Sequence, residues 1–168
     1  MQNHFELFDL APSYALEAEA LEQRYRDIQA RIHPDRFAQA GEAERRASMQ
    51  WTTRVNEAYR TLKSPVQRAK YLLELQGVDV AFETSTQMPP EFLTRQLELR
   101  EALAEARGAE ALDRLRDDVR TETRVLEARI GELLDARRDP AAAAVEVRKL
   151  MFLNKLGEEI ELAYEDTA

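Results

Sequence analysis

Ile32-His33-Pro34-Asp35-Arg36-Phe37 is the stretch around which this chain is organised. It contains one of the two histidines of the sequence and lies between two segments with helical periodicity. A proline cannot continue a helix, and it restricts the residue before it to extended backbone. The stretch therefore predicts an exposed corner that keeps His33 and Asp35 close together. Taken alone, His-Pro-Asp is most often an ordinary capped turn between helices, so the flanking segments have to decide between a turn and a functional site.

The composition is typical of a soluble helical protein. The 168 residues are 44% hydrophobic and 33% charged, with only five glycines, which favours helices. The sequence has no cysteine, and this excludes disulfides, thiol catalysis and thiolate metal sites. No apolar run approaches the roughly 20 residues of a membrane span, and the first residues lack the features of a signal peptide. We therefore expect a cytoplasmic protein that works without a cofactor.

Helical patterns flank the corner on both sides. Before it, a short apolar segment ends at Pro12, and apolar residues then recur at intervals of three and four from about residue 17 to 32. After it, a long helix is expected over about 42–63, and its inward stripe is expected to contain Ala47, Trp51, Val55, Ala58, Tyr59 and Leu62. A further helix should begin at Pro65, because proline suits the first helical position, and should stop at Gly77.

Charges are sorted along the helix that precedes the corner. Glutamates come first, and Arg24, Arg26 and Arg31 follow. Acidic residues suit a helix N-terminus and basic residues its C-terminus, so this order has an ordinary explanation. The functional alternative is a basic patch beside the corner that steers an acidic partner.

Taken together, these features resemble the J domain of DnaJ-type co-chaperones. The similarity includes Val55-Asn56-Glu57-Ala58-Tyr59-Arg60-Thr61-Leu62 and the Ser64-Pro65 that follows. The resemblance implies that His33, Pro34 and Asp35 trigger ATP hydrolysis by a DnaK-like chaperone. It implies a contact with the same chaperone for Arg24, Arg26, Arg31 and Arg36, and Arg36 stands where the family often has lysine.

The second half predicts three helices behind a polar linker. Helical patterns run over about 90–107, 110–138 and 140–165, separated at Gly108 and at Asp139-Pro140. Short connections between long helices imply antiparallel neighbours, and hence a three-helix bundle. The stripe of the middle helix is expected to contain Leu112, Leu115, Val119, Leu126, Ile130 and Leu133. The stripe of the last helix is expected to contain Val145, Phe152, Leu153, Leu156, Ile160 and Ala163.

The first helix of this bundle has more apolar surface than a core stripe requires. At about 100° per residue, Leu93 and Leu97 fall to one side of the stripe that begins at Phe92. Beside them lie the acidic residues Glu98, Glu101 and Glu105. Leucines bordered by glutamates indicate a small interaction patch. The alternative is a wide core-facing stripe with a solvated acidic back.

Two further segments of this half are informative, Phe92-Leu93-Thr94-Arg95-Gln96-Leu97-Glu98-Leu99-Arg100-Glu101 and Arg148-Lys149-Leu150-Met151-Phe152-Leu153-Asn154-Lys155-Leu156. Both resemble the C-terminal domain of the HscB family, J-domain co-chaperones of bacterial iron–sulfur cluster assembly. The resemblance implies a J domain over 1–77, a linker over 78–89 and a scaffold-binding three-helix bundle over 90–168. The implied partners are an HscA-like chaperone, which holds the ATP, and an IscU-like iron–sulfur scaffold. The implied scaffold contacts are Leu93, Leu97, Glu98, Glu101, Glu105 and Phe152, while Thr94 stands where relatives often have a larger apolar residue.

Two other classes of function fit parts of the sequence. His33 and Asp35 could be the acid–base pair of an enzyme, but no second cluster of titratable residues converges on the corner in sequence. The first half could be a helix-turn-helix nucleic-acid binder. Residues 1–77 carry 11 basic and 11 acidic side chains, and residues 78–168 carry 13 and 21, which gives the net charge of −8. Because nucleic acid favours a basic surface, we expect no nucleic-acid partner. The lack of a long apolar run predicts that the chain has no membrane partner either.

Overall fold

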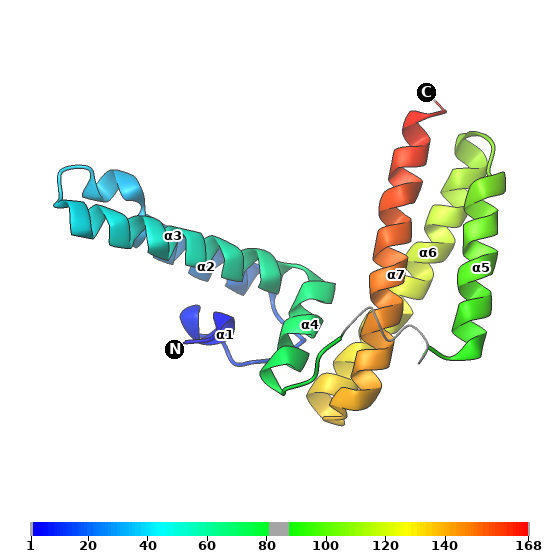
Figure 1. The fold of residues 1–168 in the computed structure, drawn as a ribbon, viewed down its shortest axis with the longest axis horizontal. Helices are drawn as coiled ribbons and strands as arrows, with labels where there is room; N and C mark the ends of the chain where they lie inside the picture. The colour runs from blue at the N-terminus through cyan, green and yellow to red at the C-terminus, as the bar shows by residue number, and fades with distance from the viewer. Residues whose placement is uncertain (1, 81–87, 168) are drawn as a thin grey trace. The chain divides into compact units, whose positions relative to one another are not determined.

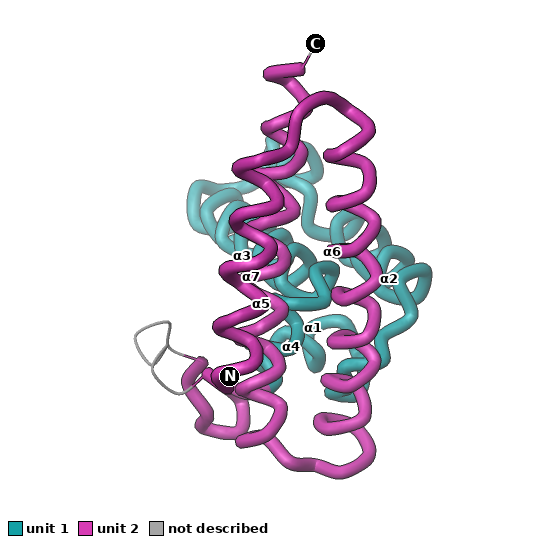
Figure 2. Tube along the Cα trace, turned by 90° about the vertical axis from the view of Figure 1, so that its right-hand side faces the viewer, with its two compact units in different colours: residues 1–72 teal, residues 73–168 magenta. Residues whose placement is uncertain are grey.

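The computed structural model describes residues 2–80 and 88–167, and these residues form helices and loops without a strand (Figure 1). The all-α fold class predicted from composition and periodicity is therefore confirmed. The chain divides into two compact units, residues 1–72 and 73–168 (Figure 2). The predicted domain limits after residues 77 and 89 stay a prediction, and residues 81–87 of the predicted linker lie outside the described residues.

The first unit begins with α1 (His4–Leu7), a single helical turn that is held by its cap. The Asn3 side chain accepts the backbone N–H of Glu6 at 2.9 Å, and the Glu6 carboxylate accepts the backbone N–H of Asn3 at 3.4 Å. This reciprocal pair is a capping box, which satisfies two N–H groups that a helix start leaves without partners. The turn places Phe5 and Phe8 in the core, where they are 0% and 1% exposed.

An antiparallel hairpin of two long helices forms the body of this unit (Figure 1). Its members are α2 (Ala18–Ile32) and α3 (Glu42–Lys63), and the corner between them contains the short 3-10 helix η1 (Pro34–Phe37). The ring of Tyr25 on α2 stacks on Tyr59 of α3, with ring centres 4.0 Å apart. The Tyr25 hydroxyl also donates to Asn56 Oδ1 at 2.6 Å. The two helices are thus joined by a polar contact as well as by apolar packing.

The predicted inward stripe of α3 is buried only in its C-terminal half. Val55, Ala58 and Leu62 are at most 1% exposed, but Trp51 is 41% exposed and Ala47 also lies at the surface. In Figure 1 the corner end of the hairpin extends beyond α1 and α4 (Pro65–Leu75), so fewer elements cover α3 there. The prediction that Trp51 and Ala47 belong to the core is therefore wrong.

The end of α4 is shaped by Gly77, as the sequence predicts. Gly77 has a φ of 77°, a conformation that costs a residue with a side chain free energy. Its N–H donates to the Glu74 carbonyl at 3.0 Å, and the N–H of Val78 donates to the Leu73 carbonyl at 2.9 Å. This is the Schellman pattern, which satisfies the last carbonyls of a helix and stops it.

The second unit contains three long helices in antiparallel succession (Figure 2). They are α5 (Pro90–Glu105), α6 (Gly108–Gly131) and α7 (Pro140–Glu165). The predicted middle helix is not α-helical to residue 138, because it ends in the π-helical turn η3 (Glu132–Ala136). Every residue of its predicted stripe is buried, namely Leu112, Leu115, Val119, Leu126, Ile130 and Leu133.

The core face of α7 differs slightly from the predicted one. Leu153, Leu156 and Ile160 are buried as predicted, and Val147 and Leu150 are buried with them. Val145, Phe152 and Ala163, which the sequence places in the same stripe, are only half-buried. The stripe that packs against α6 is therefore rotated away from Phe152.

Helix α5 buries fewer apolar side chains than α6 and α7 do. Among its residues, all of which the structure describes, Leu99 is the one that is buried, at 2% exposure. Arg95 Nε pairs with Glu122 of α6 at 2.6 Å, and Arg100 pairs with Glu159 of α7. Across the described parts of the chain, the helices are all too short or too polar to cross a lipid bilayer.

Candidate functional site

The His-Pro-Asp corner consists of one extended residue followed by a turn of 3-10 helix. His33 ends α2 with φ −55° and ψ 135°, and Pro34 begins η1, where no backbone N–H is required. Nδ1 of His33 accepts the backbone N–H of Asp35 at 3.2 Å. With Nδ1 as acceptor, the proton of the neutral ring is on Nε2. The neutral His33 ring therefore keeps an N–H donor for another partner.

Both polar side chains of the corner reach solvent. The His33 side chain is 48% exposed and the Asp35 side chain 94% exposed. Oδ2 of Asp35 lies 3.7 Å from His33 Nδ1, a distance at which an ion pair requires protonated imidazole. The shorter contact is the hydrogen bond from the Asp35 N–H, and it requires an unprotonated Nδ1. This hydrogen bond therefore belongs to the neutral ring. The corner thus presents a donor and a carboxylate side by side.

Two side chains fix the corner to the end of α2. Ser48 of α3 is 4% exposed, and its hydroxyl donates to the Ile32 carbonyl at 2.6 Å. Arg36 Nη1 donates to the Ala30 carbonyl at 3.0 Å. Both carbonyls belong to the last turn of α2, where helix geometry leaves acceptors without partners. The Ser48 bond holds Ile32, which immediately precedes His33, and the Arg36 bond holds Ala30 in the same turn.

Ser48 is a positioning residue that was not predicted from the sequence. Its signal was present, because Ser48 lies seven residues before Val55 and therefore falls on the apolar stripe of α3. A polar residue on such a stripe needs a hydrogen-bond partner once it is buried. Arg36, predicted as a chaperone contact, also acts as a helix cap, and its side chain remains exposed.

The arginines of α2 do not form one face. At about 100° per residue, Arg24 and Arg31 lie about 20° apart around the helix, while Arg26 lies roughly 140–160° from both. Arg24 pairs with Asp9 at 3.5 Å and Arg26 with Glu22 at 2.5 Å. Both guanidinium groups are largely exposed, and exposed ion pairs of this kind are weak enough to exchange for a partner. Arg24 and Arg31 thus share one flank of α2, and Arg26 occupies another.

The predicted patch on α5 is exposed. Leu93 is 41% and Leu97 66% exposed, so these leucines are not part of the core stripe. The glutamates beside them, Glu98, Glu101 and Glu105, are exposed as well. Thr94 is exposed, and its hydroxyl donates to the Pro90 carbonyl at 3.2 Å. The structure brings the two leucines together on one flank of a rigid helix, and what binds them stays a prediction.

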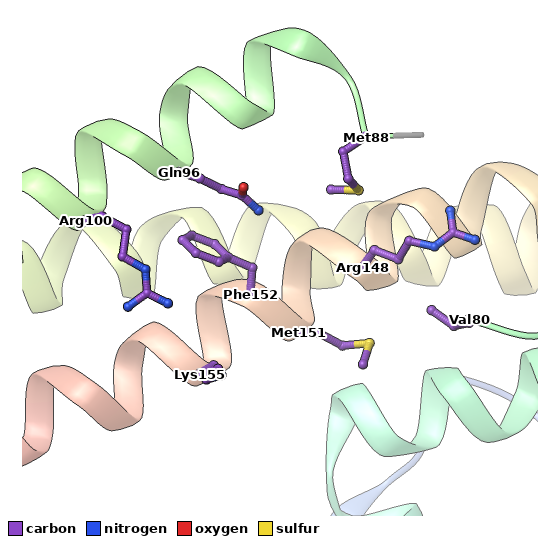
Figure 3. A pocket seen from close by; sticks show the side chains of 8 residues that line it. All are labelled: Val80, Met88, Gln96, Arg100, Arg148, Met151, Phe152 and Lys155. Atoms are coloured by element: carbon purple, nitrogen blue, oxygen red, sulfur yellow. The ribbon is translucent and has the colours of Figure 1, made fainter. Parts of the chain in front are cut away.

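Phe152 lies between the core and the surface. Its ring packs edge-on against Phe92, with ring centres 5.8 Å apart and planes at 89°. The guanidinium of Arg100 lies 5.3 Å from the centre of the Phe152 ring. The same ring lines a cavity together with Gln96 (Figure 3). Phe152 is therefore placed where a partner bound to α5 can also contact α7.

The described residues 2–80 and 88–167 contain no group of three or more histidine, aspartate or glutamate side chains that could hold a metal ion. The corner offers hydrogen-bonding groups and charge, and α5 offers apolar area and charge.

Comparisons with known proteins give consistent results. Residues 88–161 match the family described as the HSCB C-terminal oligomerisation domain. A co-chaperone protein HscB homolog from Burkholderia vietnamiensis is 50% identical over 161 residues, which cover 94% of this chain and 91% of the relative. Chaperone HscB from Vibrio cholerae has a TM-score of 0.88 and 37% identity, with 99% of this chain and 100% of that chain covered. The human co-chaperone protein HscB has a TM-score of 0.94 and 29% identity, with 97% and 82% covered.

Proposed function

Because the chain belongs to the HscB family of co-chaperones, we propose that it binds an IscU-like iron–sulfur scaffold and delivers it to an HscA-like chaperone of the DnaK type. It stimulates ATP hydrolysis by that chaperone and so assists the maturation of iron–sulfur proteins. ATP is held by the chaperone, and the iron–sulfur cluster is cargo of the scaffold. We propose that the protein acts in the cytoplasm.

The chaperone contact is assigned to the J domain, residues 1–77. Its central residues are His33, Pro34 and Asp35, and its basic residues are Arg24, Arg26, Arg31 and Arg36. The support is geometric: an exposed carboxylate and an imidazole N–H are held by backbone and side-chain hydrogen bonds. Polar groups that are ordered before binding lose less entropy when a partner engages them. Arg24 and Arg31 on one flank of α2 add a positive field that accelerates encounter with an acidic surface.

The scaffold contact is assigned to the bundle, residues 90–168, which the linker over 78–89 joins to the J domain. Its residues are Leu93, Leu97, Glu98, Glu101, Glu105 and Phe152. Exposed leucines supply apolar area, and the glutamates beside them select a partner with basic residues. Thr94 contributes less apolar area here than the larger residue that relatives often carry.

Joining both contacts in one chain explains how the protein would work without chemistry of its own. A scaffold held by the bundle is presented to the chaperone at an effective concentration that the length of the linker sets. The observation that carries the proposal is the pairing of an exposed, hydrogen-bonded His-Pro-Asp corner with an exposed leucine patch in one chain of this family.

The test is single-turnover ATP hydrolysis by the cognate HscA-like chaperone, with wild-type protein or the H33Q variant, in the presence and absence of scaffold. Wild-type protein should accelerate hydrolysis, and scaffold should increase the acceleration further. H33Q should reduce the rate to that of the chaperone alone, yet bind scaffold as wild type does. The matched control is H4Q, since His4 stacks on Tyr71 far in sequence from the corner. Full stimulation by H33Q would refute the role of the corner.

A further inference from the structure

A cavity of about 190 Å³ lies between the middle of α5 and the middle of α7 (Figure 3). Its apolar lining comes from Val80, Met88, Met151 and Phe152. Pockets for drug-sized ligands measure about 300–1,000 Å³, so this cavity has room for one or two side chains rather than for a nucleotide. Its dimensions fit a partner protein better than a small cofactor.

Three cations surround this apolar lining. Arg148 and Lys155 extend from α7, and Arg100 reaches in from α5 (Figure 3). A spacing of seven residues puts Arg148 and Lys155 about 20° apart around the helix, and thus on one face. Residues 78–168 carry 21 acidic and 13 basic side chains. The cavity is therefore a local positive site in the acidic half of the chain.

The charges of this site are only partly balanced. Arg100 pairs with Glu159, but neither Arg148 nor Lys155 forms an ion pair with any residue that the structure describes. The Nε atom of Arg148 is buried and makes no hydrogen bond within the described residues. Two cations without an ion-pair partner favour an anion beside them, so an incoming carboxylate would gain ion pairs with Arg148 and Lys155 here.

The cavity adjoins the leucine patch of α5. Around that helix, Leu93 lies about 20° and Leu97 about 60° from Arg100, in the same direction. Glu101 and Glu105 follow at about 100° and 140° in that direction. The two exposed leucines thus lie between a positive cavity and a negative strip. A partner on the leucines would meet opposite charges at its two edges.

We propose that the cavity is a second half of the client-binding surface and takes an aspartate or glutamate of the client, together with a neighbouring apolar side chain. This inference rests on the proposed function, because the client is the iron–sulfur scaffold. It assigns the charges of the interface by position: basic scaffold residues meet the glutamates of α5, and acidic scaffold residues meet Arg148 and Lys155. Such an arrangement fixes the orientation of the bound scaffold, which the leucines alone cannot do.

The experiment measures scaffold affinity by titration calorimetry for the full-length protein. The R148Q/K155Q variant should bind about tenfold more weakly, with a shallower dependence of affinity on salt, because two charges of the interface are lost. The matched control R120Q/R124Q removes two exposed cations of α6 and should bind as wild type does. K155E, at an exposed position, provides a second variant that does not depend on the packing of Arg148.

The possible results separate this inference from the function on which it rests. If wild-type protein binds scaffold and both R148Q/K155Q and K155E bind equally well, the cavity proposal is wrong while the function stands. If wild-type protein fails to bind scaffold, the function itself is wrong. Sedimentation of the protein alone tests a second copy as the occupant: self-association that R148Q/K155Q abolishes would overturn the assignment to the client.

Discussion

The corner at His33 and the leucine patch on α5 are both exposed, but they are built in opposite ways. The corner depends on four directional hydrogen-bonding groups: His33 Nδ1, the Asp35 amide, the Ser48 hydroxyl and the Arg36 guanidinium. The patch depends on a regular helix that buries Leu99 and leaves Leu93 and Leu97 uncovered.

Polar recognition at the corner and apolar recognition on α5 therefore place different requirements on the fold. Polar groups bind specifically when they are held at fixed angles, and two side chains accordingly bond the corner to the last turn of α2. Apolar area is not directional, and a patch of leucines needs only a rigid helix whose outer flank no other element covers. The corner should therefore be sensitive to the loss of a single hydrogen bond, and the patch to the loss of area.

The largest effect is expected from removing the area of the patch. L93A/L97A should weaken scaffold binding by roughly 2–4 kcal/mol, since exposed leucines at the centre of an interface can be hot spots. The helical circular dichroism signal should not change, because neither leucine is buried. ATPase stimulation without scaffold should also stay at the wild-type level. Titration calorimetry and the single-turnover assay measure these quantities.

A matched control for this prediction is L162A, which removes another exposed leucine, 61% exposed on α7. It should bind scaffold with wild-type affinity. Equal affinities for L93A/L97A and wild type would show that the patch is not the scaffold site.

A smaller effect is expected from loosening the corner. S48A leaves the Ile32 carbonyl without the hydrogen bond from the Ser48 hydroxyl, and should lower the free energy of unfolding by about 1–2 kcal/mol. ATPase stimulation should fall, because the residue before His33 is no longer held, while scaffold affinity should be unchanged. Urea unfolding and single-turnover hydrolysis measure the two losses. T53A removes an exposed hydroxyl of the same helix and should alter neither; wild-type stimulation by S48A would mean that the corner does not need this bond.

The smallest effect is expected at a position that belongs to neither region. Partial burial and the hydrogen bond that the Tyr164 hydroxyl donates to Asp113 at 2.5 Å raise the pKa of Tyr164 above its ordinary value near 10. Above pH 10 the unfolded chain loses this proton more readily than the folded one. The stabilising contribution is therefore complete below pH 10 and is lost as pH rises through the higher pKa of the folded state.

Urea midpoints of wild type and Y164F, measured between pH 8 and 11, test this expectation. Wild-type stability should decline more steeply than that of Y164F above pH 10, since phenylalanine has no proton to lose. Parallel curves would show that the Tyr164–Asp113 bond does not contribute to stability. Scaffold binding at pH 8 should be the same for both proteins.

The amino-acid sequence by itself determined the features that depend on local backbone chemistry. Pro34 breaks the helix before the corner and Gly77 stops α4 through its left-handed backbone, and both follow from the residue types alone. The heptad stripe of α6 was also predictable, because a helix that packs along its whole length against a partner buries one regular face.

Only the tertiary structure decided which residues of a stripe are covered. Trp51 and Val55 lie on one predicted stripe, yet Trp51 is exposed, because the elements that pack on α3 near the corner cover a narrower face, which contains Ser48 and not Trp51. The same dependence on neighbours buries Ser48 against the Ile32 carbonyl, half-exposes Phe152, and gathers Arg100 and Arg148 from separate helices around one cavity. Periodicity states which residues share a face of a helix, whereas burial and charge at that face depend on elements distant in sequence.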